Sequence, residues 1–241
     1  YTVRNAFHHH FDYIDKYYTP FIPAAKRMNA KIKRDIDPVN NDGITLIPQA
    51  MSIVADEVID LHRQLVPYGY DEINVNLGCP SGTVVSKKRG SGILAYPDML
   101  DSFLDELYTK ADFPVSIKTR VGFNDDELWP RLIEIYSKYP ISELIVHPRV
   151  QKDFYKNTPR MDDFALAMQK INPDKTTLCY NGDITDTNSF NALTDCFPDI
   201  DEIMIGRGLF ANPALIAELK GISMDKAELR ERLKNWHDEI L

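Results

Sequence analysis

The residues best suited to chemistry form one stretch, Asn76-Leu77-Gly78-Cys79-Pro80-Ser81, which the basic and glycine-rich segment Lys87-Lys88-Arg89-Gly90-Ser91-Gly92 soon follows. The stretch comes directly after an apolar run, 71–75, that is typical of a buried strand. A strand that ends in Gly-Cys-Pro places its thiol on a sharp, rigid loop, with the amide of Asn76 close before it. This arrangement suits proton donation to a bound ligand, with phosphate-bearing material nearby. The alternative is that Cys79 is simply buried, as most free cysteines are.

Polar side chains also close other apolar runs of the sequence. Lys118 and Arg120 close one run, and His147 and Arg149 close the next. Because side chains alternate along a strand, each pair is expected to point to one side of its strand. Together with Gln49 from an earlier run, these groups offer cationic and amide donors. They suit a ligand rich in carbonyl oxygens and ring nitrogens, such as a flavin or a pyrimidine.

Two glycine-bearing turns close the last two runs, Asn181-Gly182-Asp183-Ile184 and Gly206-Arg207-Gly208. Barrel proteins commonly bind phosphate at the loops after strands seven and eight, and Arg207 adds a planar cation that can grip a phosphate in two places. The carboxylate of Asp183 would repel a phosphate. We therefore expect Asp183 to contribute its backbone N–H, or to cap a helix that begins near Thr185. The alternative is that these glycines only make turns.

The hydrophobic periodicity predicts an alternation of short strands and amphipathic helices, which implies parallel pairing. The predicted strands are 13–18, 45–48, 72–76, 115–119, 143–146, 176–180 and 202–205. The predicted helices are 3–11, 51–66, 97–110, 126–138, 162–171, 187–194, 212–219 and 225–241. A long polar connection, 26–42, carries a turn-rich cluster and is expected on the side where active-site lids lie.

Polar groups end almost every predicted strand, and this decides between two parallel α/β folds. In a TIM (β/α)8 barrel all strand ends ring one site, whereas an open doubly wound sheet concentrates its site at one switch point. The sequence therefore predicts a barrel. Only seven strands are predicted, so we expect the first strand of the barrel to be missing before Tyr1.

Bulk composition limits the class of protein. The 241 residues are 44% hydrophobic and 27% charged, which is typical of one soluble globular domain. The net charge of -8 excludes a surface coated with positive charge, but it allows a local basic face. The three cysteines form no even framework, which predicts a reducing, cytoplasmic location. No apolar run approaches the roughly 20 residues that span a bilayer, so we expect no membrane partner.

Other reactive side chains are interpreted as structural. The consecutive residues His8, His9 and His10 point in different directions on a helix and cannot chelate together, so we expect no metal there. His62 is expected on the protein surface. Cys179 is expected in the barrel interior, and Cys196 in helix packing.

Taken together, these motifs resemble the tRNA-dihydrouridine synthases, FMN-dependent barrel enzymes that reduce uridine in tRNA. The resemblance runs from about Tyr1 to Leu219 and rests first on Asn76-x-Gly78-Cys79-Pro80 with Val84 and Gly90-x-Gly92. Further matches follow in order: Ile47-Pro48-Gln49, Lys118-x-Arg120-x-Gly122, His147-x-Arg149 with Tyr155, Asn181-Gly182-Asp183-Ile184 and Gly206-Arg207-Gly208.

The resemblance implies a role for each matched residue. Cys79 would be the catalytic general acid, which protonates C5 of the uracil after FMN has delivered hydride to C6. The implied FMN-binding residues are Gln49, Lys118, His147, Asn181, Gly182, Asp183, Gly206 and Arg207. The implied substrate-binding residues are Asn76, Arg120, Arg149 and Tyr155. A cysteine thiol is mostly protonated at neutral pH, as a general acid must be.

The resemblance also implies partners and domains. NADPH would reduce the flavin, and the target uridine of tRNA would be turned out into the pocket. The tRNA backbone would contact basic loop residues, namely Lys87, Lys88, Arg89, Lys152, Lys156 and Arg160. Residues 1–221 would form the FMN-binding catalytic barrel, and 222–241 would begin a C-terminal helical tRNA-binding domain or close the barrel. We expect a monomer.

The sequence departs from the family at two places, and two rival functions stay open. Nothing before Tyr1 supplies the Pro-Met pair of the family's first strand, and the loop 35–41 lacks one acidic residue of the family pattern. The nearest rival is an FMN barrel that acts on a free pyrimidine, of the dihydroorotate or dihydropyrimidine dehydrogenase kind. A second rival is a catalytically silent RNA-binding barrel, which would have no reason to keep the thiol, the amide and the flavin-binding residues together.

Overall fold

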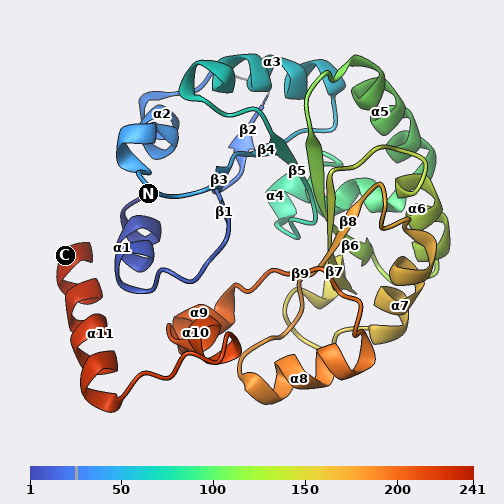
Figure 1. The fold of residues 1–241 in the computed structure, drawn as a ribbon. Coiled ribbons are helices and arrows are strands. Elements are labelled where there is room, and N and C mark those ends of the chain that lie inside the picture. The colour runs from blue at the N-terminus through green and yellow to red at the C-terminus, as the bar shows by residue number, and fades with distance from the viewer. Residues whose placement is uncertain (25–26) are drawn as a thin grey trace.

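The computed structural model describes residues 1–24 and 27–241, and it shows a parallel sheet surrounded by helices (Figure 1). The strands are β1 (Tyr17–Tyr18), β2 (Ile22–Pro23), β3 (Leu46–Ile47), β4 (Gln49–Met51), β5 (Ile73–Leu77), β6 (Val115–Gly122), β7 (Glu143–Val150), β8 (Thr177–Tyr180) and β9 (Glu202–Ile203). The helices are α1 (Thr2–His10), α2 (Ala30–Ile36), α3 (Ala55–Leu65), α4 (Gly82–Val85), α5 (Pro97–Lys110), α6 (Trp129–Tyr136), α7 (Met161–Lys170), α8 (Thr187–Cys196), α9 (Arg207–Ala211), α10 (Leu215–Leu219) and α11 (Lys226–Ile240). Short 3-10 turns are η1 (Pro38–Asn40), η2 (Val66–Tyr68), η3 (Gly90–Ala95) and η4 (Gln151–Asp153).

The strands pair in the order of the chain, and every pair is parallel. The main sheet runs β2-β4-β5-β6-β7-β8-β9, and β1 pairs with β3 just ahead of it. The segments 17–23 and 46–51 each contribute two short strands, so the sheet has seven strand positions. All seven lie at or next to the predicted ranges, which confirms the parallel α/β class. Over residues 1–24 and 27–241, no backbone pairing joins β9 to β2.

Two predicted segments differ from the structure. The first predicted strand, 13–18, is paired only at Tyr17 and Tyr18. The connection 26–42, expected to be a polar loop, contains α2 and η1. Asn29 caps α2 by accepting a hydrogen bond from the N–H of Ile32, and the fully buried Ile36 anchors the helix in the core. The pattern of apolar residues in this segment was too sparse to reveal that helix.

The helices form because their apolar residues recur at helical spacing and face the sheet. α5 starts at Pro97, a residue favoured in the first turn, and buries Leu100, Phe103, Leu104 and Leu107. All residues of β5 are buried, since helices cover its outer face and other side chains fill its inner face. The core therefore fixes the direction in which each strand end points.

The two ends of the chain lie side by side, because α11 packs on α1 (Figure 1). The ring of Trp236 meets those of Phe7 and Phe11 edge-on, with centroids 5.7 Å and 6.2 Å away. His9 and His10 both contact the carboxylate of Glu239, at 2.7 Å and 2.9 Å. These histidines thus hold a helix contact. No described helix is long and apolar enough to cross a membrane.

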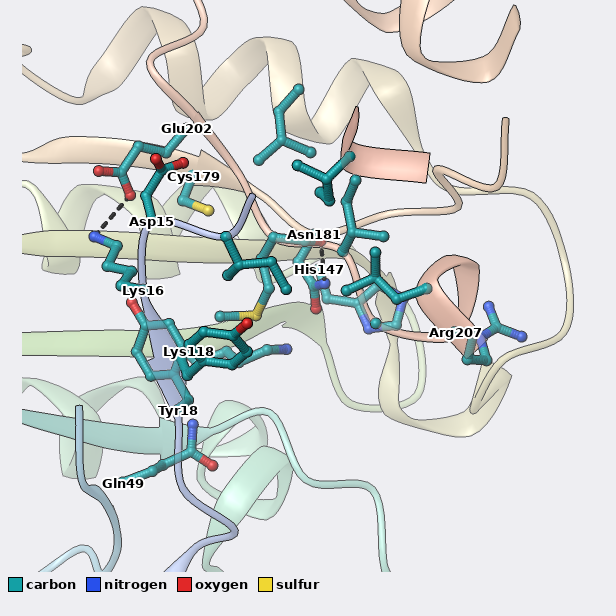
Figure 2. Close-up of a pocket in the computed structure, with 18 of the residues that line it drawn as sticks. Asp15, Lys16, Tyr18, Gln49, Lys118, His147, Cys179, Asn181, Glu202 and Arg207 are labelled. Carbon is teal, nitrogen blue, oxygen red and sulfur yellow. Dashed lines mark hydrogen bonds and ion pairs between the residues drawn. The ribbon is translucent and has the colours of Figure 1, made fainter. Parts of the chain in front are cut away.

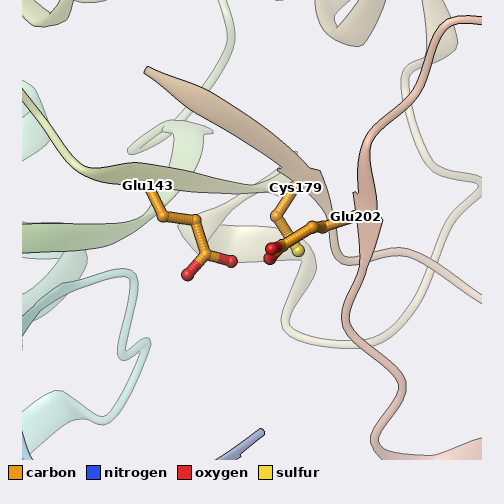
Figure 3. Close-up of side chains that lie close together, drawn as sticks. All are labelled: Glu143, Cys179 and Glu202. Carbon is orange, nitrogen blue, oxygen red and sulfur yellow. The ribbon is translucent and has the colours of Figure 1, made fainter. Parts of the chain in front are cut away.

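A cluster of charged groups lies inside the sheet where the strands begin. Glu143 starts β7, Glu202 starts β9, and the buried thiol of Cys179 lies between them on β8 (Figure 3). The three potential ligand atoms lie within 4.8 Å of one another. The ammonium of Lys16 lies 2.9 Å from Glu143 and 2.8 Å from Glu202, so the protein itself supplies a cation that the two carboxyl groups share. The prediction that Cys179 lies in the interior is confirmed.

Replacing Lys16 tests how much this cluster stabilises the fold. Lys16→Met leaves the buried Glu143 carboxylate without its cation, so we expect the free energy of unfolding to fall by about 2 kcal/mol or more. The matched control is Lys110→Met, because Lys110 forms only exposed ion pairs with Asp56 and Glu106. Urea denaturation at pH 7 measures both variants. Equal losses in the two variants would contradict this account of the cluster.

Candidate active site

The predicted site residues surround one large cavity inside the sheet (Figure 2). Its volume is about 1350 Å³, ample for a nucleotide-sized ligand. It brings together all but one of the predicted site residues: Gln49, Asn76, Cys79, Lys118, Arg120, His147, Tyr155, Asn181, Gly182, Asp183, Gly206 and Arg207. The exception is Arg149, which is 1% exposed and lies behind the cavity wall.

A chain of amide hydrogen bonds lines the inner face of the first strands. The amide nitrogen of Gln49 donates to Asn74 at 2.9 Å, and that of Asn74 donates to Ser116 at 3.1 Å. The amide nitrogen of Asn76 donates back to Gln49 at 2.7 Å. Because β4, β5 and β6 are adjacent and parallel, residues of matching register reach one another across the sheet. The chain of bonds fixes the side chains of Gln49 and Asn76.

The thiol loop, which we define as Gly78-Cys79-Pro80, follows the end of β5. The carboxamide oxygen of Asn76 accepts the N–H groups of Gly78 and Cys79, at 3.1 Å and 2.9 Å. The carbonyl of Cys79 accepts hydrogen bonds from both the N–H and the hydroxyl of Ser91. Cys79 is half-buried and lines the cavity, so the alternative that it is simply a buried cysteine is wrong.

Cations crowd the wall formed by β6 and β7. Burial, together with the nearby Arg120, lowers the pKa of Lys118 to about 8. Arg120 is 2% exposed, and its guanidinium donates to the carbonyls of Gly78, Val150 and Phe154 at 3.0, 3.0 and 2.7 Å. Three of its five N–H groups are thus used within the protein.

The imidazole ring of His147 is neutral. Burial and the surrounding cations Arg120, Lys118, Arg149 and Arg207 lower its pKa to about 2. Its Nε2 lies 3.3 Å from a guanidinium nitrogen of Arg149, which can only donate. Nε2 therefore accepts, and the single proton of the neutral ring resides on Nδ1.

The carboxylate of Asp183 binds two arginines, so the expectation that it caps the helix near Thr185 is wrong. The alternative, that its backbone N–H contacts a phosphate, stays a prediction. Arg149 donates to both carboxylate oxygens, and Arg207 donates to one at 2.7 Å. The hydrogen bonds from Arg149 hold the pKa of Asp183 below its usual range. The cap of α8 is Asp186, whose side chain accepts the N–H of Ser189 at 2.8 Å.

The turns after β8 and β9 retain donors for an anion. Among the described residues, the N–H groups of Gly182 and Asp183 have no hydrogen-bond acceptor. A side chain at position 182 would not fit, since its Cβ would lie 1.9 Å from the hydroxyl of Tyr180. Arg207 is 59% exposed at this end of the cavity. Free N–H groups beside an exposed guanidinium fit a phosphate group, and Lys118 and Gln49 provide donors for a flavin ring.

Tyr155 and its neighbours form the mouth of the cavity. The ring of Tyr155 is exposed, and its centroid lies 4.7 Å from the guanidinium carbon of Arg207 and 5.7 Å from that of Arg120. The roles of Tyr155, Asn76, Arg120 and Arg149 in binding a substrate stay predictions. For Arg149 the donors already go to Asp183, His147 and the carbonyls of the segment 156–157.

Several other side chains differ from expectation. His62 is buried and stacks on Phe113 with ring centroids 3.4 Å apart, so its assignment to the surface is wrong. Cys196 is exposed and does not pack in the core. Of the basic loop residues, Arg89 is paired with Glu57, and Arg160 is paired with Asp153 and Asp126. The remaining four, Lys87, Lys88, Lys152 and Lys156, are exposed.

Comparison with known proteins decides the family. The sequence model described as "Dihydrouridine synthase (Dus)" matches residues 4–238. The chain belongs to the dihydrouridine synthase family. The match includes every predicted site residue, and the TIM-barrel fold of the family agrees with the parallel α/β architecture.

Curated relatives within the family support this assignment. A "Probable tRNA-dihydrouridine synthase" of Staphylococcus aureus is 34% identical over 154 residues, which are 62% of this chain and 46% of that protein. The proteins named tRNA-dihydrouridine synthase B of Pasteurella multocida and Escherichia coli are 28% and 30% identical, over 77% and 72% of this chain and 55% and 53% of their own lengths. The chain thus spans about half the length of the curated relatives it matches.

Two residues that hold the thiol loop, Ser91 and Gln151, were not predicted from the sequence to do so. Ser91 holds the Cys79 carbonyl, and the side-chain amide of Gln151 donates to the Pro80 carbonyl at 2.9 Å. Gln151 lies two residues after the His147-x-Arg149 motif, which is the only signal in the sequence that could have drawn attention to it.

A substitution of Gly90 tests the packing behind the thiol loop. Its φ is +54°, and a Cβ there would lie 2.7 Å from the Cys79 carbonyl oxygen. We expect Gly90→Ala to cost about 1–3 kcal/mol of stability and to displace the loop, because both backbone strain and the contact oppose the methyl group. The matched control is Gly82→Ala, whose Cβ would meet nothing within 4 Å. Urea denaturation and the alkylation rate of Cys79 measure the effect, and equal behaviour of the two variants would contradict it.

Lys118 makes the stability of the folded protein depend on pH. Its folded pKa of about 8 lies below the ordinary lysine value of 10.5, so between these values the unfolded state binds more protons and stability rises with pH. Relative to Lys118→Met, the wild-type protein should gain about 2 kcal/mol between pH 7 and pH 10. Urea denaturation across this range measures the difference, with Lys170→Met on the surface as control. A flat difference for Lys118→Met would show that its ammonium is not desolvated.

Proposed function

We propose that this protein is an FMN-dependent tRNA-dihydrouridine synthase, which reduces the C5–C6 bond of specific uridines in tRNA. The observation that carries the proposal is the position of Cys79. Its thiol loop lines the same cavity as Lys118, His147 and the turns with free N–H groups. A proton donor and a flavin-sized polar cavity are the two elements that this reduction requires. Membership of the dihydrouridine synthase family favours this function over reduction of a free pyrimidine.

FMN fits the residues that surround the cavity. Gly182, Asp183, Gly206 and Arg207, with Asn181 beside them, would hold the phosphate through N–H groups and one guanidinium. Gln49, Lys118 and His147 would contact the ring and the ribityl chain, where the ammonium of Lys118 would balance negative charge. When bound and reduced by NADPH, FMN supplies the hydride that is added to C6 of the uracil.

The protein supplies the proton and holds the base. Cys79 would donate its Sγ proton to C5, on the face of the uracil opposite the hydride. Arg120 keeps two N–H groups after its three contacts with backbone carbonyls, and Asn76 keeps one amide N–H. These donors would bind uracil oxygens, while the exposed ring of Tyr155 would stack at the mouth of the cavity.

tRNA would reach the cavity with its target base turned out of the fold. Lys87 and Lys88 follow the thiol loop, and Lys152 and Lys156 flank the segment that carries Tyr155. All four are exposed and would contact phosphates, which makes binding sensitive to salt. Arg89 and Arg160 contribute less, since carboxylates of the protein already neutralise them.

Further proposals concern organisation and location. Residues 1–221 would form the catalytic domain, and residues 222–241 would begin a tRNA-binding domain or close the barrel through the contact of α11 with α1. The three free cysteines are in keeping with a cytoplasmic location. NADPH as reductant and a monomeric state complete the proposal.

Cys79→Ala tests the proposed reaction. Purified protein is incubated with FMN, NADPH and unmodified tRNA, and nucleoside mass spectrometry detects uridine that has gained two hydrogens. Without its proton donor, the variant should lose at least about 100-fold in rate, while flavin binding and NADPH oxidation stay within about 2-fold. The control is Cys196→Ala, whose thiol is exposed and outside the cavity.

Two outcomes would overturn the proposal. If Cys79→Ala loses its flavin, the thiol supports cofactor binding and is not the proton donor. If the wild-type protein leaves tRNA unchanged but reduces free uracil or a related pyrimidine, the rival free-pyrimidine reductase is the better description.

A further inference from the structure

The thiol loop is supported at every backbone polar group that it has. Asn76 accepts the N–H groups of Gly78 and Cys79, and Ser91 donates to the carbonyl of Cys79. These two supports come from residues near the loop in sequence. Pro80 has no N–H, so the groups that still need a partner are the carbonyls of Gly78 and Pro80.

The remaining two carbonyls are held by donors from the next two strands of the sheet, β6 and β7. Arg120 donates to Gly78 at 3.0 Å from the end of β6. Gln151 donates to Pro80 at 2.9 Å from the turn η4, which directly follows β7. The loop that carries Cys79 therefore depends on a residue 71 positions further along the chain.

Gln151 is itself held in place by Arg120 and Asp153. The guanidinium of Arg120 donates to the carbonyls of Val150 and Phe154, on either side of the turn. The buried carboxylate of Asp153 accepts the N–H of Val150 at 3.2 Å. Phe154 adopts φ 53° and ψ −97°, a strained conformation for a bulky residue, and its carbonyl is bound by Arg120. Such strain persists only where several contacts fix the backbone.

We propose that Gln151 is a positioning residue for Cys79, which sets the location of the thiol by fixing the carbonyl of Pro80. This inference rests on the proposed role of Cys79 as proton donor. The thiol loop is half-buried, so hydrogen bonds rather than core packing determine where Sγ lies. A misplacement of about 1 Å can cost a reaction on the order of 100-fold, so one lost hydrogen bond at this loop has a kinetic effect.

Gln151→Leu removes the donor at similar volume, and Gln169→Leu on the exposed face of α7 is the matched control. The first readout needs no activity. In Gln151→Leu, hydrogen exchange of the Gly78 and Cys79 amides should be about 10-fold faster, because the loop opens locally, while the melting temperature stays within about 2 °C. Gln169→Leu should exchange like the wild-type protein. Gln151→Arg, which restores N–H donors, should bring the exchange rate back towards the wild-type value.

The second readout is kinetic. In single turnovers, oxidation of the reduced flavin by tRNA should slow by about 10- to 100-fold in Gln151→Leu, while reduction by NADPH and the KM for tRNA change less than about 2-fold. In a Cys79→Ala background, adding Gln151→Leu should slow the reaction no further, because Gln151 acts through the thiol. A merely structural role would make the two losses additive.

The two readouts separate this inference from the proposed function. Unchanged exchange at Gly78 and Cys79, or additive losses in the double variant, would overturn the role of Gln151. If the wild-type protein does not reduce tRNA, the proposed function fails and with it the kinetic part of the inference. Hydrogen exchange then decides by itself whether Gln151 fixes the thiol loop.

Discussion

The guanidinium of Arg120 is the contact on which the rest of the cavity depends. It is almost fully buried, and it binds the carbonyl of Gly78 in the thiol loop, that of Val150 at the end of β7 and that of Phe154 just after η4. Burial lowers its pKa to about 10, so it still carries its charge at neutral pH. The desolvation of that charge is offset by three charge-assisted hydrogen bonds. One side chain thereby joins the thiol loop and the segment that carries Tyr155 into a single rigid unit.

The same wall concentrates more positive charge than the protein neutralises. Lys118, Arg120, Arg149 and Arg207 lie around the neutral ring of His147, and Asp183 is the carboxylate that binds two of them. This excess occurs in a protein whose net charge is -8, so it reflects local placement rather than composition. Burial, together with this crowding of cations, lowers the pKa values of Lys118 and His147. An anionic ligand would reduce the repulsion, which is a physical reason for the cavity to bind a phosphate-bearing cofactor.

Sequence patterns could predict which residues share the cavity, but not what each one contacts. In a parallel sheet all strands end at the same edge, so polar residues at the ends of apolar runs, such as Gln49 and Lys118, had to meet. The pairing of Arg149 with Asp183 and the bond from Gln151 to Pro80 join distant segments through irregular turns. No local spacing encodes such contacts. His62 shows that burial on a helix is also hard to predict from sequence. It was assigned to the surface because it is polar, but its ring stacks on Phe113.

The two ends of the cavity differ in the charged groups that can contact a ligand, so the cavity is electrostatically asymmetric. At the strand starts, the ammonium of Lys16 is shared by Glu143 and Glu202, so this end offers no free cation to an anionic ligand. At the strand ends, Arg207 is exposed, and the N–H groups of Gly182 and Asp183 have no acceptor among the described residues. These donors would hold an elongated ligand by its anionic group at the strand ends. The amide chain of Gln49 and Asn76, beside the loop that presents Cys79, would then contact the rest of the ligand. The same electrostatic asymmetry that would bind the cofactor thus also determines which part of it faces the thiol.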